Sequence, residues 1–534
     1  MYPRKLTRSI ITNPDYPVVE TRQGKLRGLW CEDVFIFRGV QYARAGRFQM
    51  PQEVEPWEGT KEAIIFGPVC PEMHTAIAHD EYNVPHYHYI QDEECHYLNI
   101  WTKHIEKDAK KPVMVWIHGG GFSTGSSIEL YAYDGHELCD FGDVVVVSIN
   151  HRLNCIGYLD LSEYGEEYKY TGNLGQVDLV AALKWINQNI EAFGGDPGNV
   201  TIMGQSGGGG KVSSLLQTPS AAGLFHKASI QSGLFEGSKD NTPEKSRAMA
   251  KLVVENLAIK DIHDIETIPY YQLARAAQAA EKQMSAQYGF GLHFGPVRDL
   301  DFYMGAGEDV PFIEENKNVP VLVGNVLGEF DGNYNQIYGE GSKNDWSEEQ
   351  VNTLVKEAFG DKAEAVTAAH RKAYPKAKPV DVLYVNRGCR IPARDFGKKR
   401  FAEGCAPVYN WLFNLESPLN SGTIAWHNVE EAYMFHNANY LEASYIPGVS
   451  EQLQDQMTGA WVSFAYTGDP NHTGMPLWHA VDAENGACMI FDAVTREECH
   501  HDDELMSILP PKSIVGKNAR RPRSTFGGGP RQSL

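Results

Sequence analysis

The sequence lacks several features that direct a chain to a metal, a membrane or a nucleic acid. Its 534 residues contain nine cysteines but no C-x-x-C spacing, so no zinc site is expected. No apolar run is long enough to span a bilayer. Acidic residues outnumber basic ones and leave a formal net charge of −21. Because an acidic surface repels phosphate backbones and anionic lipid, nucleic-acid and membrane partners are not expected.

The two ends of the chain carry little hydrophobic sequence. The start, MYPRKLTRSIITNPDYP, lacks the apolar segment of a secretory signal. We therefore expect a cytoplasmic protein, with secretion after removal of a leader as the alternative. Residues 516–534 are basic and rich in glycine and proline, which predicts a disordered tail. No repeat or low-complexity linker divides the rest, so residues 1–515 are predicted to form one domain.

Short apolar runs spaced along the chain predict a mostly parallel α/β sheet. Each run is continuous rather than alternating, which is typical of strands covered on both faces. An amphipathic helical stretch between Val180 and Ile190 separates two of the runs, and strand–helix–strand order favours parallel pairing. A polar, helix-rich region at about 240–290 is expected to be an insertion over the sheet. The predicted strands are 113–117, 144–149, 200–203, 321–323 and 408–412.

The stretch GQSGGGGKVSS at 204–214 has three interpretations: a flexible linker, a phosphate-binding loop, or a turn that carries a reactive serine. A phosphate-binding loop needs glycine where Gln205 stands and Ser or Thr where Val212 stands, so two defining positions fail. A linker is disfavoured because the stretch directly follows a predicted strand and leads into the periodic VSSLL.

The third interpretation, G-x-S-x-G, fits residues 204–208 and is centred on Ser206. Such a serine occupies a sharp strand-to-helix turn, and glycine neighbours relieve its strained backbone. The helix N-terminus there favours developing negative charge. A second glycine turn, HGGGF at 118–122, follows the 113–117 strand, and its amides are unobstructed by side chains. Together the two turns predict acyl transfer at Ser206.

Longer segments resemble the carboxylesterase/cholinesterase family of α/β-hydrolases, the type-B carboxylesterases. The resemblance extends from about residue 18 to about residue 510 and is nearer to bacterial carboxylesterases than to cholinesterases. It implies an α/β-hydrolase fold with a central, mostly parallel sheet flanked by helices, and with helical insertions over an active-site gorge. The segments that carry it are FRGVQYA at 37–43, ECHYLNIW at 94–101, HGGGF at 118–122, the long block 172–208, and WVSFAYTGDPN at 461–471.

The resemblance implies a catalytic triad of Ser206, Glu329 and His427. His427 opens the segment HNVEEAYMF, which matches the family's histidine motif. Glu329 matches the acid in NVLGEF, but both of its neighbours depart from the usual D-E-G, and Asp331 is a rival. In the implied mechanism, His427 takes the proton of Ser206 as the serine attacks an ester carbonyl, and water later releases the acyl group. No metal or cofactor is required.

Gly120, Gly121 and Gly207 match the family's oxyanion donors. Gly207 stands where alanine is usual, and we expect function to be spared because the donor is a backbone N–H. Cys70 and Cys95 match the family's first disulfide, but reducing cytoplasm disfavours such bonds, so either state is open.

Departures from the cholinesterases point to neutral esters. The loop between the two cysteines has no tryptophan for a choline cation, and Gln205 replaces a glutamate next to the serine. The expected apolar pocket residues are Phe122, Phe290, Phe294 and Trp426, beside Gln205. The predicted activity is a serine carboxylesterase acting on a small-molecule ester. An amidase or lactonase with the same triad, and a non-catalytic binding protein, are the alternatives. The oligomeric state is not predicted.

Overall fold

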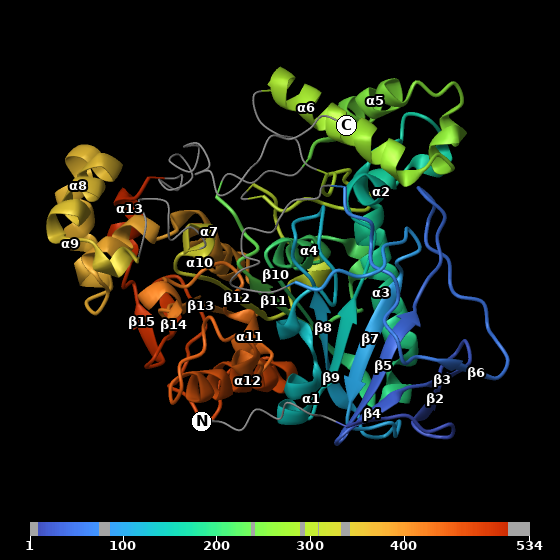
Figure 1. The fold of residues 1–534 in the computed structure, drawn as a ribbon, viewed down its shortest axis with the longest axis horizontal. Helices are drawn as coiled ribbons and strands as arrows, with labels where there is room; N and C mark the ends of the chain where they lie inside the picture. The colour runs from blue at the N-terminus through green and yellow to red at the C-terminus, as the bar shows by residue number, and fades with distance from the viewer. Residues whose placement is uncertain are drawn as a thin grey trace, which may run out of the picture.

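A twelve-stranded sheet forms the centre of the computed structural model, which describes residues 9–73, 86–236, 241–288, 294–307, 309–332 and 342–510 (Figure 1). Seven strands of this sheet run parallel to one another, in the spatial order β9, β8, β10, β11, β12, β13 and β14. Antiparallel neighbours extend both edges. The strands in spatial order are β1 (Ile10–Ile11), β4 (Leu29–Cys31), β5 (Val34–Gln41), β7 (Tyr97–Thr102), β9 (Val145–Ile149), β8 (Lys111–Ile117), β10 (Gly195–Gln205), β11 (Lys227–Gln231), β12 (Val321–Val326), β13 (Val408–Phe413), β14 (Ala487–Phe491) and β15 (Arg496–Cys499).

Four of the five predicted strands fall within strands of this sheet, and the fifth, 144–149, begins one residue before β9, so the α/β class is confirmed. A separate small sheet pairs β2 (Val18–Glu20), β3 (Lys25–Arg27) and β6 (Thr60–Glu62). The α-helices are α1 (His136–Gly142), α2 (Asn154–Tyr158), α3 (Leu174–Asn189), α4 (Gly207–Leu215), α5 (Pro243–Leu257), α6 (Tyr270–Tyr288), α7 (Glu329–Gly332), α8 (Glu348–Phe359), α9 (Ala363–Ala373), α10 (Arg387–Ala402), α11 (Glu431–Met434), α12 (Ser450–Thr467) and α13 (Asp503–Ile508).

Strand β8 shows why the predicted strands are apolar throughout. Val113, Val115 and Ile117 pack in one core cluster with residues of α3 and α4. Met114 and Trp116 pack in another cluster with residues of α1 and α12. Since successive side chains point to opposite faces, a strand covered on both faces needs apolar residues at every position.

The helix-rich region at about 240–290 forms α5 and α6, which pack against each other. Figure 1 shows this pair beside α2, on the opposite side of the molecule from α12. Buried residues of both helices share one core cluster with residues of α2. The division into one domain and a tail stays a prediction, and residues 516–534 lie outside the described residues.

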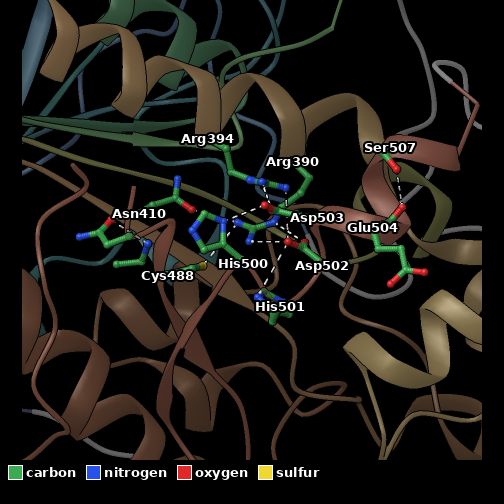
Figure 2. Close-up of polar contacts among 12 residues, drawn as sticks. Arg390, Arg394, Asn410, Cys488, His500, His501, Asp502, Asp503, Glu504 and Ser507 are labelled. Atoms are coloured by element: carbon green, nitrogen blue, oxygen red, sulfur yellow. Dashed lines mark hydrogen bonds and ion pairs between the residues drawn. The ribbon is translucent and has the colours of Figure 1, made fainter. Parts of the chain in front are cut away.

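A buried ion pair fastens the C-terminal helix α13 to α10 (Figure 2). Nε of Arg390 lies 2.7 Å from Oδ2 of Asp502, and both side chains are buried. Arg390 also donates to Oδ1 of Asn410 at 2.9 Å on β13, so the cluster ties three segments together. Burial works against the ionised carboxyl, but the guanidinium of Arg390 outweighs it and holds the pKa of Asp502 well below its usual range.

Within the described ranges, no helix combines the length and the apolar character needed to cross a membrane. The described residues likewise contain no cluster of three or more histidine, cysteine or carboxylate side chains suited to a metal ion.

Candidate active site

Ser206 occupies the turn between β10 and α4. Its φ of 55° and ψ of −126° are strained for a residue with a side chain. The turn is held by the Ser206 amide, which donates to the Gln231 carbonyl at 2.8 Å. A Cβ at Gly204 would lie 2.6 Å from the Ile117 carbonyl oxygen, and one at Gly208 would lie under 3.0 Å from the same atom. The flanking glycines therefore let the turn approach the end of β8, as the elbow motif predicts.

The four consecutive glycines after Ser206 are not equivalent. A Cβ at Gly207 would come under 3.0 Å from backbone atoms of Gly121, closer than real Cβ atoms come. At Gly209 it would lie 2.9 Å from the Gln231 carbonyl oxygen. At Gly210 the nearest atom is Cζ of Phe122 at 3.5 Å, an ordinary van der Waals distance. Close backbone packing therefore requires glycine at the first three positions but not at the fourth.

The second glycine turn lies directly against the serine turn. Gly120 and Gly121 adopt φ of 78° and 64°, a region that favours glycine. Among the described residues, none accepts a hydrogen bond from the amides of Gly120, Gly121 or Gly207. Amides without a protein acceptor at adjoining turns are suited to stabilise an oxyanion beside Ser206.

Glu329 and His427 contact each other directly. Oε2 of Glu329 forms a short hydrogen bond with Nδ1 of His427, and the His427 amide donates to the Glu329 carbonyl at 3.0 Å. The other carboxylate oxygen, Oε1, accepts from Oγ of Ser232 at 2.8 Å and from the Val326 amide at 3.0 Å. Every carboxylate oxygen of this buried side chain is thus satisfied. The side chain of its rival, Asp331, lies outside the described residues.

The two ring nitrogens of His427 have different surroundings. Nε2 is buried and has no hydrogen-bond partner among the described residues. The ring of Phe330 covers the imidazole, with ring centroids 4.0 Å apart. Because Nδ1 is held by Glu329, Nε2 is the nitrogen left to accept the proton of a hydroxyl.

Strand order brings these segments together. Ser206, Ser232 and Glu329 follow β10, β11 and β12, which are neighbours in the parallel sheet, and His427 follows the next strand, β13. Carboxyl ends of parallel strands share one edge of a sheet, where open α/β sheets place their sites. Ser232 has no signal in the sequence, because it is a single serine after a short strand.

Glu430 is a second buried carboxyl near the triad acid, and sequence reasoning did not assign it a role. Burial, followed by the charge of Glu329, raises its pKa well above the usual value. Burial and the neighbouring carboxyl therefore both disfavour the ionised form of Glu430. Its place in HNVEEAYMF was visible in the sequence, but its burial was not.

The predicted pocket residues differ in their exposure. Phe122 is partly exposed and packs edge-on against Tyr158, with ring centroids 5.4 Å apart. Phe294 and Gln205 are nearly inaccessible, and Trp426 is completely buried in the core cluster of α1 and α12. The assignment of these four residues to the substrate pocket stays a prediction. Phe290 lies outside the described residues.

Cys70 and Cys95 are both free, buried thiols, so the disulfide left open by the sequence is not formed in the structure. Burial, together with a contact from the Cys70 thiol, raises the pKa of Cys95 well above its usual value. Sγ of Cys70 also accepts a hydrogen bond from the Leu153 amide at 3.2 Å. The Cys95 thiol is therefore not activated as a nucleophile.

Comparison with known proteins identifies the family of the chain. The carboxylesterase family matches residues 15–505. The para-nitrobenzyl esterase of Bacillus subtilis is 30% identical over 513 residues, which cover 93% of this chain and 99% of that protein. An esterase from the anaerobe Clostridium hathewayi, which can hydrolyse aliphatic aromatic polyesters, is 44% identical with a TM-score of 0.89, covering 94% of this chain and 99% of that one. A Geobacillus stearothermophilus carboxylesterase is 33% identical with a TM-score of 0.72, covering 92% and 99%.

These matches span nearly the whole chain, and they agree with the α/β fold. The chain belongs to the carboxylesterase family and is a carboxylic ester hydrolase.

Proposed function

We propose that Ser206, His427 and Glu329 hydrolyse carboxylic esters through an acyl-enzyme. The observation that carries this proposal is the hydrogen-bonded Glu329–His427 pair, whose Nε2 has no partner among the described residues. His427 takes the Ser206 proton as Oγ attacks the ester carbonyl, and then gives that proton to the departing alcohol. Water, activated by the same histidine, cleaves the acyl-enzyme.

The oxyanion of each tetrahedral intermediate is proposed to be held by the amides of Gly120, Gly121 and Gly207. Preorganised amides of this kind contribute about 10²–10³-fold in rate per donor. Glu329 is proposed to keep the imidazole in one tautomer and to stabilise its cation.

The Ser206→Ala variant tests the mechanism. It should lose hydrolysis of p-nitrophenyl butyrate and stoichiometric labelling by an organophosphonate. Ser213→Ala, on the same helix, is the matched control and should keep both. Full turnover by Ser206→Ala would refute the proposal.

The substrates are proposed to be neutral esters, because Gln205 beside the nucleophile is uncharged and buried. A pair of isosteric substrates, 3,3-dimethylbutyl acetate and acetylcholine, differs only in the charge of the alcohol. The neutral ester should show the higher kcat/KM, and a preference for acetylcholine would contradict the proposal. p-Nitroacetanilide and a γ-lactone, measured in parallel, decide between ester, amide and lactone hydrolysis.

A second candidate substrate follows from the 44% identity to the Clostridium hathewayi esterase, which can hydrolyse aliphatic aromatic polyesters. We infer that this chain also cleaves ester bonds between aromatic acids and aliphatic diols. Release of terephthalate products from a poly(butylene adipate-co-terephthalate) film, measured against Ser206→Ala, tests this. Hydrolysis of p-nitrophenyl esters without release from the film would contradict the polyester proposal while leaving the esterase mechanism intact.

A further inference from the structure

Lys211 is a buried lysine behind the glycine turn that holds Gly120. It lies on α4, five residues after Ser206, and its side chain is completely buried. Its Nζ donates to the His118 carbonyl at 3.0 Å and to the Gly119 carbonyl at 3.5 Å. In the described part of the chain, no carboxylate forms an ion pair with this amine. Besides these two carbonyls, the amine contacts the Phe122 ring, with 5.9 Å to the ring centroid. A buried amine whose hydrogen bonds go only to backbone carbonyls is costly, and its position calls for a reason.

The Gly119 carbonyl is a shared acceptor. Nδ1 of His118 lies 3.0 Å from it, in addition to the Lys211 amine. The same peptide group carries the N–H of Gly120 at its other end. Donors at a carbonyl oxygen draw electron density from the peptide, so the N–H at the opposite end becomes a stronger donor.

Gly125 lets the polar groups around the Gly119 carbonyl lie close together. It adopts a φ of 94°, and a Cβ there would lie 2.8 Å from Nδ1 of His118, 2.9 Å from Oε1 of Glu129 and 3.0 Å from the Gly119 carbonyl oxygen. A side chain at Gly125 would separate these groups. The carboxylate of Glu129 also favours the protonated form of Lys211.

We propose that Lys211 is a positioning residue for ester hydrolysis, which orients and polarises the peptide between Gly119 and Gly120 so that the Gly120 amide binds the oxyanion. This inference rests on the proposed oxyanion role of Gly120. A protonated amine in this low-dielectric site also adds positive potential behind the oxyanion as its negative charge develops.

The alternative is that Lys211 only fastens the turn. The two roles predict opposite changes in stability. Burial lowers the pKa of Lys211 to about 7, below its value near 10.4 in the unfolded chain. Between pH 7 and pH 10.4 the unfolded chain binds more protons at this amine than the folded protein does. Burying the charged amine therefore lowers the free energy of unfolding at pH 7, and this cost disappears as pH rises toward 10.4. Removing the amine therefore should not lower stability at pH 7 if catalysis is its purpose.

Lys211→Met keeps an unbranched side chain, one atom shorter, and removes its charge and donors. We expect kcat for p-nitrophenyl butyrate to fall 10- to 100-fold with KM within about two-fold. The Ki of a trifluoromethyl ketone, which forms an oxyanion on Ser206, should rise by a similar factor. The thermal unfolding midpoint at pH 7 should stay the same or rise. Lys227→Met, a second buried lysine, which bonds to Asn199 on another strand, should change none of the kinetic values.

Wild-type kinetics in Lys211→Met would overturn the inference. It would also be overturned if kcat fell together with the unfolding midpoint while the Ki of the ketone stayed unchanged. Ser206→Ala, measured alongside, separates the two levels. An active Ser206→Ala refutes the proposed function, whereas an inactive Ser206→Ala with a fully active Lys211→Met refutes the role of Lys211 alone.

If Lys211→Met does not fold, the wild-type enzyme provides the test. The ketone should bind several-fold more weakly as pH rises through the pKa of Lys211. The facing groups are Glu129, Cys70, His118 and His151, and burial holds the pKa of both histidines well below 6.5, so they stay neutral throughout. A ketone Ki that is constant from pH 6 to pH 9 would overturn the inference.

Discussion

Replacing Gly207 by alanine is the sharpest test of how this site is packed. Alanine is usual at this position in the family that the sequence resembles, so the change looks harmless. In this chain an added Cβ would lie under 3.0 Å from backbone atoms of Gly121, whereas ordinary contact begins at 3.4 Å. The Gly121 turn would have to retreat by about 1 Å, and a misplacement of about that size costs roughly 100-fold in rate.

We therefore expect Gly207→Ala to lower kcat for p-nitrophenyl butyrate about 100-fold, or about 2.7 kcal/mol of transition-state stabilisation. Gly210→Ala is the matched control, because it makes the same change on the same helix where the nearest atom is 3.5 Å away. It should keep kcat and raise stability by about 0.5–1 kcal/mol through helix propensity. Stopped-flow kinetics and thermal unfolding measure both. Full activity and unchanged stability in Gly207→Ala would show that the turn does not constrain the donor.

The remaining predictions probe the acid, the helix packing and the C-terminal ion pair. Glu329→Gln should lower kcat about 10⁴-fold at unchanged KM, and a fall under tenfold would assign the acid elsewhere. Ser232→Ala removes one of the hydrogen bonds to that carboxylate and should lower kcat about tenfold, as steady-state kinetics will show. Gly209→Ala should lower the free energy of unfolding by about 1–3 kcal/mol, and a neutral effect would contradict the close packing. Asp502→Asn should cost about 3–5 kcal/mol by leaving Arg390 unpaired. Because the pKa of Asp502 is depressed in the folded protein, the ionised carboxyl adds to the free energy of unfolding above about pH 4, and this stabilisation is lost as pH falls further. The free energy of unfolding of the asparagine variant should therefore not show this loss between pH 4 and lower pH.

Local patterns in the sequence predicted the sheet and the turn around Ser206. A strand covered on both faces must be apolar at successive positions, and a strained turn must have small neighbours. Both requirements are met by adjacent residues, so both can be read from one segment of the chain. The histidine motif at His427 was visible in the same way, through resemblance rather than through physics.

Tertiary structure alone decided the relations between distant segments. Glu329 contacts His427 because β12 and β13 are neighbours, which no local pattern states. Trp426 adjoins the histidine in sequence, but its side chain packs completely buried in a core cluster with residues of α1 and α12. In the glycine run, backbone atoms of Gly121, Ile117 and Gln231 lie close to Gly207, Gly208 and Gly209 respectively, whereas no backbone atom lies that close to Gly210. Whether a glycine is required, or a lysine is buried, depends on what lies across from it, and that is decided only when the chain has folded.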